Sequence, residues 1–250
     1  MSASSSGAPP LVTPNLDSEP APDIDYDALV TEDHKPVDRI FLEKLYRLLT
    51  RPLYASWPGP GEGRPFLVLV NVGWFYQRKT PAVVPDCLLS LDVSCPEDLQ
   101  VKQGHSYYQW DMGKQPDVVI EVISDRTGGE ETYKKDLYAR LGVPYYVVYD
   151  PKGLLAPDPL RIYEIVGREY RRADPGPWPK VGLGLRLWQG QFEGHEDTWL
   201  RWCDASGEII PTGEERARQA EERARQAEER SAALVAELQR LKGKLPPETL

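Results

Sequence analysis

The stretch PDVVIEVIS at residues 116–124 decides the fold, because it combines a run of Val and Ile with two acids. Side chains alternate between the two faces of a strand, so Asp117 and Glu121 lie on one face of a predicted strand over 117–123. A carboxylate among Val and Ile is costly to bury unless a cation or hydrogen bonds compensate its charge. Two explanations of Glu121 stay open on this stretch alone. It is either a structural acid that faces solvent or a lysine, or a functional ligand.

The residues after the next polar loop, YKKDLYARLGVPYYVVYD at 133–150, predict a helix and a second apolar strand. We expect the helix over 130–141, with Gly142 at the left-handed position that ends it. Pro144 prevents the helix from continuing, and a strand follows over 144–150. A strand, a basic helix and another strand in direct succession predict an α/β protein.

A second segment with an acid lies upstream, VVPDCLLSLDV at residues 83–93. It reads as a buried strand that carries Asp86 just behind a proline. Two neighbouring strands would each supply a carboxylate, and magnesium is held by one or two carboxylates with water and phosphate oxygens. Asp86 and Glu121 are therefore candidate metal ligands, and Lys134 on the following helix could face the same pocket.

The other apolar segments predict a mixed sheet covered by helices. Apolar residues at helical spacing indicate a helix over 37–50, and further strands are expected at 66–76 and 160–166. Together with the segments above they form a predicted core over 25–166. Short alternating segments then predict a β-rich appendage over 167–212. Its bulk comes from tryptophans that would form a small satellite core, namely Trp188, Trp199 and Trp202.

The C-terminal segment 213–250 contains the repeat EERARQA, which begins at Glu214 and again at Glu221. Seven-residue spacing puts small and then large apolar residues on one seam, as in a coiled coil. The seam consists of Ala217, Ala220, Ala224, Ala227, Ser231, Leu234, Leu238, Leu241 and Leu245. A solitary charged helix is the alternative, because four heptads with small residues barely exceed the length that isolated helices need. We expect the tail to pair with a second copy as a homodimer, and truncation after Pro211 to leave the core folded.

The charge is unevenly distributed. The chain of 250 residues has a net charge of −9, of which the first 35 residues carry −6 and residues 213–250 none, so the core carries about −3. Such a core has no basic footprint for tight, salt-sensitive DNA binding, so DNA affinity would be weak or would depend on a metal or a partner. Residues 1–24 are rich in Ser, Ala, Pro and acids, which predicts a disordered tail.

Several classes of protein are disfavoured. No segment has the roughly 20 apolar residues of a membrane span, and the N-terminus lacks the regions of a signal peptide, so we expect a cytoplasmic protein without membrane contact. The three cysteines form no CxxC pair and no cluster with the three histidines, which argues against zinc and iron-sulfur sites. Tyr107, Tyr108 and Trp110 could stack on an unpaired base, but packing is the favoured interpretation.

Several motifs of this sequence resemble those of a known family. They are Pro85-Asp86, the stretch 116–124, Lys134 four residues before Tyr138, GVPYY at 142–146 and VYDP at 148–151. Over roughly residues 25–210 the chain resembles the Uma-type family of putative restriction endonucleases, a bacterial branch of the PD-(D/E)XK nuclease superfamily. The resemblance implies a restriction-endonuclease-like mixed sheet flanked by helices. It also implies that Asp86 and Glu121 bind the metal and that Lys134 is the catalytic lysine, and Asp117 matches the motif as well.

One position departs from the parent pattern of the superfamily. The lysine expected two residues after the acidic ligand is replaced by Ile123, and Lys134 on the adjoining helix looks like its substitute. Lys135 competes for this role, because successive helical residues point about 100° apart. The superfamily often adds an acid from its first helix, where Asp38 and Glu43 lie, although such acids are usually only solvated.

The function implied is a metal-dependent DNA endonuclease that uses Mg²⁺ or Mn²⁺. Asp86 and Glu121 would hold the metal, and Lys134 would assist the attacking water. The alternative is a protein with a nuclease fold that no longer cleaves DNA and acts as a binding or dimerising module. The acidic net charge and the changed position of the lysine are compatible with this alternative.

Overall fold

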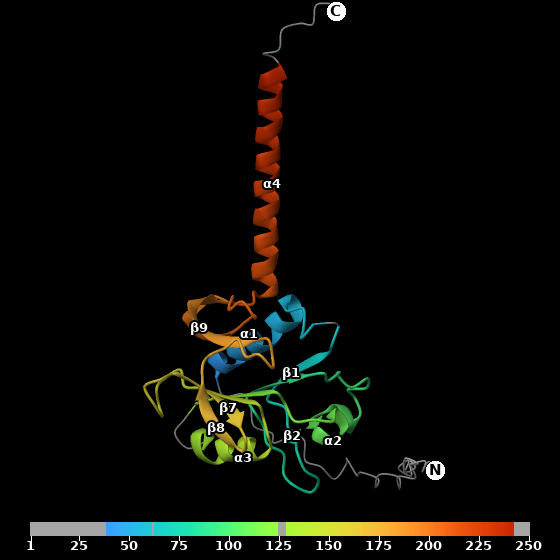
Figure 1. Ribbon diagram of the computed structural model, residues 1–250, viewed down its shortest axis with the longest axis vertical. Helices are drawn as coiled ribbons and strands as arrows, with labels where there is room; N and C mark the ends of the chain where they lie inside the picture. The colour runs from blue at the N-terminus through green and yellow to red at the C-terminus, as the bar shows by residue number, and fades with distance from the viewer. Residues whose placement is uncertain (1–38, 62, 125–128, 243–250) are drawn as a thin grey trace, which may run out of the picture.

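The computed structural model describes residues 39–61, 63–124 and 129–242. A six-stranded sheet in the order β1-β3-β5-β6-β7-β8 forms its centre (Figure 1). The strands of this sheet are β1 (Phe66–Val70), β3 (Cys87–Leu91), β5 (Val118–Val122), β6 (Tyr145–Tyr149), β7 (Leu160–Val166) and β8 (Glu169–Ala173). Two smaller pairs accompany it, β2 (Trp74–Phe75) with β4 (Tyr107–Tyr108), and β9 (Gly184–Phe192) with β10 (His195–Cys203).

Helices precede, connect and follow the strands. They are α1 (Ile40–Ser56), the short η2 (Lys102–Gly104) and α2 (Gln109–Met112), the π-helical turn η3 (Glu130–Lys134), α3 (Lys135–Arg140) and α4 (Gly213–Lys242). Of these, α1 and α3 pack on the sheet. Strands β5 and β6 run parallel, and η3 and α3 form the crossover between them, as parallel neighbours require. The other neighbouring strands of the sheet are antiparallel.

The two faces of β5 pack into different apolar clusters. Val118, Ile120 and Val122 belong to a cluster with the leucines of α1 and with the β9–β10 hairpin, whereas Val119 lies in a cluster with Tyr138 of α3. The alternation expected for residues 117–123 is therefore present. It puts Glu121 on the α3 face of the sheet.

Several predicted elements have different bounds in the structure. The strand expected over 83–93 is shorter, because β3 spans Cys87–Leu91 and Val83 instead forms a bridge with Trp74 of β2. The strand expected over 66–76 is wrong as a single strand, because Asn71 adopts a left-handed φ of 52° that turns the chain after β1. The residues beyond the turn pair with β4 instead of the central sheet. The helix expected over 37–50 begins at Ile40 and continues to Ser56, and its first two predicted residues lie outside the described part of the chain.

The separate satellite core predicted for the appendage is also wrong. Trp199 and Trp202 are fully buried in the same cluster as the α1 leucines, and Trp188 packs against that cluster. The indole Nε1 of Trp202 donates a hydrogen bond of 2.8 Å to the carbonyl of Leu49 in the middle of α1. Strand β8, although it follows residue 166, extends the central sheet through its pairing with β7. The division of the chain into four domains stays a prediction.

The C-terminal helix α4 projects away from the body of the protein (Figure 1). Its first turn is capped reciprocally, because Thr212 Oγ1 accepts from the Glu215 N–H at 3.1 Å and Glu215 Oε2 accepts from the Thr212 N–H at 2.8 Å. The Glu215 carboxylate also binds both terminal nitrogens of the buried Arg201 in β10, at 2.9 and 2.6 Å. The core therefore uses a residue of the repeat segment, so truncation after Pro211 would remove the partner of a buried arginine.

Among the described residues no helix combines the length and the apolar character that a membrane crossing requires.

Candidate active site

Asp86 and Glu121 lie next to each other at the ends of two paired strands. The antiparallel register pairs Cys87 with Ile120, which makes Asp86 and Glu121 the next opposed positions along β3 and β5. The negative charge of Asp86 is one of the causes that raise the pKa of Glu121, so the two carboxylates are electrostatically coupled. The structure thus brings together the two acids that the sequence singled out.

Both oxygens of Asp86 accept hydrogen bonds. Tyr46 of α1 donates its hydroxyl to Oδ1 at 2.5 Å, and the N–H of Val122 donates to Oδ2 at 2.7 Å. Pro85, which precedes Asp86, has no N–H that could bond to a neighbouring strand. At the end of β5, the N–H of Val122 bonds to the side chain of Asp86 and not to a backbone carbonyl. Burial, followed by the charge of Asp86, raises the pKa of Tyr46, which keeps its hydroxyl protonated and able to donate.

Glu121 is the more deeply buried acid, with only 1% of the residue exposed. Its Oε2 accepts from the Lys134 ammonium at 2.8 Å, and its Oε1 accepts from the Tyr138 hydroxyl at 2.7 Å. Burial raises the pKa of Glu121 to about 8, and the lowering effects of Lys134 and Tyr138 do not offset it. The Lys134 ammonium and the Tyr138 hydroxyl therefore do not fully compensate the cost of burying this carboxylate.

The helical turn before α3 determines which of the two candidate lysines, Lys134 or Lys135, faces the acids. Lys134 ends the π-helical turn η3, whose wider register is seen in the hydrogen bond of 3.1 Å from its N–H to the carbonyl of Gly129. Its side chain is directed at Glu121, which raises the pKa of Lys134 against the lowering effect of burial. The Lys135 ammonium instead lies 3.7 Å from the centre of the Tyr163 ring. Lys134 is the lysine at the acids.

The two additional acids considered from the sequence lie elsewhere. Asp117 pairs with Lys114 at 2.6 Å and accepts from the Leu91 N–H at 2.8 Å, which ties the start of β5 to its neighbour. Glu43 forms an i,i+4 ion pair of 2.5 Å with Arg47, and half of its side chain is exposed. The structure does not bring either acid to Glu121.

The sequence analysis assigned no role in the site to three groups that contact it, although Tyr138 belongs to one of the quoted motifs. Tyr138 lies four residues after Lys134 on the same helical face, a spacing that could have indicated a shared target. Glu130, four residues before Lys134 and 8% exposed, holds an oxygen 3.4 Å from the Lys134 ammonium. Tyr46 gave no local signal, because only the packing of α1 brings it to Asp86.

The pair of acids fits a hard divalent cation. Among the described residues, no group of three or more His, Cys, Asp or Glu could hold a metal, so the protein would supply the two carboxylates of Asp86 and Glu121. Magnesium is commonly bound in this way, with water and substrate phosphate oxygens filling the other positions. The raised pKa of Glu121 supports the fit, since a cation would supply the positive charge that this buried group lacks.

A central mixed sheet with helices on its faces is consistent with a restriction-endonuclease-like fold. Comparison with protein families agrees, because the sequence model of the Uma2 family, described as "Putative restriction endonuclease", matches residues 31–177. The chain therefore belongs to the Uma2 family. No curated protein matches it. Membership of a nuclease family points to DNA as the substrate and to a divalent metal, as restriction-endonuclease-like families generally use.

Proposed function

We propose that this protein is a metal-dependent DNA endonuclease whose reaction centre is formed by Asp86, Glu121 and Lys134. The observation that carries the proposal is the contact of 2.8 Å between the Lys134 ammonium and the buried Glu121 carboxylate, at the strand end where Asp86 also lies. A bound Mg²⁺ or Mn²⁺ would supply Lewis acidity toward the scissile phosphate and a water ligand of lowered pKa.

The side chains of the protein would bind the metal, orient its ligands and stabilise negative charge. Asp86 and Glu121 hold the metal, and the hydroxyls of Tyr46 and Tyr138 keep the two carboxylates in fixed orientations. Lys134, whose pKa is raised, remains a cation and stabilises the attacking hydroxide or the negative charge that develops on the phosphate. Its side chain is 28% exposed, so this end of the site is open to a substrate.

Cleavage of a supercoiled plasmid tests the proposal. The purified protein should nick or cut the plasmid with Mg²⁺ or Mn²⁺ and not with EDTA, and Glu121→Gln should abolish the activity because it removes a charged ligand at constant size. Glu43→Gln is the matched control and should cleave like the parent, since Glu43 lies at the surface and pairs with Arg47. Undiminished cleavage by Glu121→Gln would rule out this centre.

The two lysines can be compared in the same assay. Lys134→Ala should lower turnover by about 10² or more, as expected for loss of a preorganised charge-stabilising group. Lys135→Ala should have a smaller effect, because its ammonium lies on the Tyr163 ring. The reverse ranking would move the catalytic role to Lys135.

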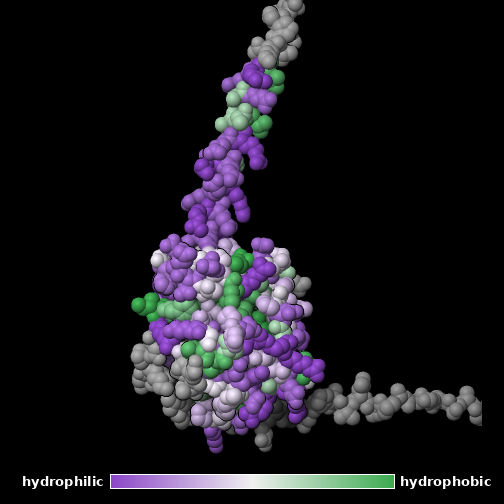
Figure 2. All heavy atoms as spheres, turned by 90° about the vertical axis from the view of Figure 1, so that its left-hand side faces the viewer, coloured by the Kyte–Doolittle hydropathy of each residue, from purple (hydrophilic) through white to green (hydrophobic). Residues whose placement is uncertain are grey.

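We further propose that α4 pairs with α4 of a second copy. The distal leucines of the heptad seam are at least half exposed, at 57% for Leu234, 57% for Leu238 and 50% for Leu241. Figure 2 shows the hydrophobic side chains of α4 gathered near its far end, above a hydrophilic stretch next to the body. A coiled-coil partner would cover these leucines. A protein that pairs through α4 but cleaves no DNA with either metal would be the alternative, a dimerising module with a nuclease fold.

A further inference from the structure

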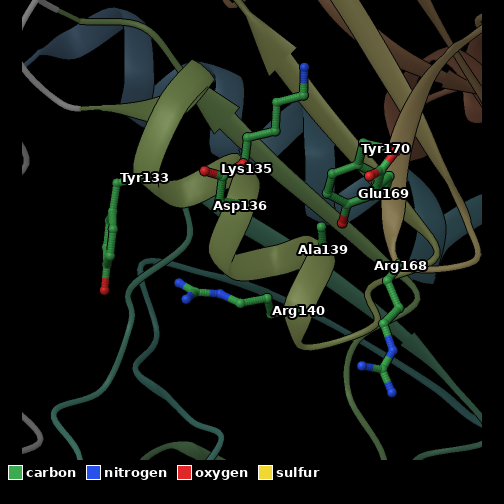
Figure 3. A pocket seen from close by; sticks show the side chains of 8 residues that line it. All are labelled: Tyr133, Lys135, Asp136, Ala139, Arg140, Arg168, Glu169 and Tyr170. Carbon is green, nitrogen blue, oxygen red and sulfur yellow. The ribbon is translucent and has the colours of Figure 1, made fainter.

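A pocket opens on the surface of the helix that carries Lys134. It lies between α3 and the β7–β8 turn (Figure 3). The lining residues are Tyr133, Lys135, Asp136, Ala139, Arg140, Arg168, Glu169 and Tyr170. Three of them are cationic and two are acidic, so the pocket is locally positive within a core of negative net charge.

Of the two tyrosines that line this pocket, Tyr133 is the exposed one, whereas Tyr170 is partly buried and donates its hydroxyl to the carbonyl of Val143. Tyr133 immediately precedes Lys134 in the chain, and 62% of it is exposed. Tyr138 and Tyr146, by contrast, are fully buried and donate their hydroxyls to groups of the site or its helix. An aromatic ring left open to solvent beside the proposed catalytic lysine has a face available for stacking.

Two arginines complete the surface. Arg140 lies at the end of α3, seven residues after Tyr133 of η3, and Figure 3 shows its side chain extended in the direction of Tyr133. Arg168 lies on the turn between β7 and β8 at the other edge of the pocket, and its side chain is exposed (Figure 3). Both arginines are exposed, and no ion pair found between described residues involves either of them. Their charges are therefore available to an anionic partner.

We propose that Tyr133, Arg140 and Arg168 form a surface that binds a single-stranded segment of the DNA substrate next to the cut. An unpaired base would stack on the Tyr133 ring, and backbone phosphates would contact the two guanidinium groups. The inference rests on the proposed function, because it identifies the substrate segment that adjoins the same reaction centre.

The chemistry of the surface favours a single strand over a duplex. Proteins bind single strands by stacking bases on exposed aromatic rings beside cations that follow the backbone. Bases inside a duplex are already stacked and are not accessible to a ring at the surface. Duplex binding without base contacts depends on a broad basic footprint, which a core of about −3 does not provide. The acids Asp136 and Glu169 in the same pocket limit that footprint further.

Fluorescence anisotropy with labelled 20-nucleotide DNA tests the inference in the cleavage-deficient Glu121→Gln background, as single strand and as duplex, over a range of salt concentrations. Tyr133→Ala should weaken single-strand binding about tenfold with little change in the salt slope, since base stacking is largely uncharged. Tyr133→Phe should keep the parent affinity. Arg140→Ala and Arg168→Ala should each lower the salt slope for the single strand by about 0.7, as expected for one lost phosphate contact.

Arg230→Ala on α4 is the matched control, because it removes an exposed arginine far from the pocket and should leave the affinity unchanged. Equal thermal melting of all variants confirms that they are folded. Three results overturn the inference: single-strand affinity unchanged in Tyr133→Ala and in the arginine variants, equal binding of duplex and single strand, or no DNA binding. Plasmid cleavage by the unmodified protein is measured separately. Cleavage without single-strand binding at this surface would overturn the inference and leave the proposed endonuclease function intact.

Discussion

Replacement of Glu121 by glutamine should stabilise the metal-free protein at neutral pH although it destroys the proposed site. Burial raises the pKa of Glu121 from 4.5 to about 8 in the folded state. Between these values the folded protein retains a proton that the unfolded chain releases, so the free energy of unfolding falls as the pH rises. Protonated Glu121 therefore does not lower the free energy of unfolding below about pH 4.5. The destabilising effect of Glu121 grows as the pH rises and is complete above about pH 8.

The size of the effect follows from the same pH window. Each pH unit in which only the folded state holds the proton costs about 1.4 kcal/mol, so the cost is about 3 kcal/mol at pH 7 and under about 1 kcal/mol at pH 5. Glutamine resembles the protonated acid in size and does not titrate. Glu121→Gln should then be more stable than the parent by about 3 kcal/mol at pH 7, and the difference should fall to under about 1 kcal/mol at pH 5.

Urea denaturation in EDTA, followed by tryptophan fluorescence at pH 5, 6 and 7, measures this difference. Glu43→Gln serves as the control and should change the stability only slightly, because its side chain is half exposed. A Glu121→Gln variant that is no more stable than the parent at pH 7, or whose advantage is the same at pH 5, would refute the account of Glu121 as a buried acid that lacks positive charge. Added Mg²⁺ should raise the melting temperature of the parent and not of the variant.

Three further changes probe the surroundings of the site and the tail. Tyr46→Phe removes the hydrogen bond to the carboxylate at the end of β3 and should weaken Mn²⁺ binding about 10- to 100-fold by isothermal titration calorimetry. Unchanged affinity would show that this hydroxyl does not orient a ligand. Glu215→Ala leaves the buried Arg201 without its carboxylate and should cost about 3 kcal/mol of unfolding free energy in urea. A loss under about 1 kcal/mol would contradict that role. Truncation after Ala220 should keep the melting temperature but shift the mass in solution to the monomer, whereas truncation after Pro211 should also lower the melting temperature. A dimer that persists without the distal seam would remove α4 as the pairing element.

The central part of the fold could be predicted because its signals are local. The alternation along 117–123 placed Glu121 opposite the apolar face of its strand, and Gly142 and Pro144 marked the boundary between helix and strand. The strand expected over 66–76 failed because hydrophobicity continues through the turn at Asn71, where the backbone and not the side-chain pattern changes.

The site was predictable only in part. Two acids on adjacent strands and a lysine on the next helix could be read from the sequence, but the choice between Lys134 and Lys135 could not. The π-helical turn adds a residue to the first turn of the helix and so changes which lysine faces the sheet. The residue types of this segment do not indicate a π-helical turn. Tyr46 is separated from Asp86 by 40 residues, and only the packing of α1 brings them together.

The position of α1 has a consequence for the order in which the protein can fold during synthesis. This helix is among the first described segments to leave the ribosome, yet one of its apolar sides is covered by residues of the β9–β10 hairpin, including Trp199 and Trp202. Until about residue 210 has emerged, the buried leucines of α1, such as Leu45 and Leu49, have only the sheet to pack against. The nascent chain must carry this uncovered surface through most of its translation, when aggregation competes with folding. Expression of residues 25–166 alone would make that transient state permanent, and such a fragment should be recovered as aggregates.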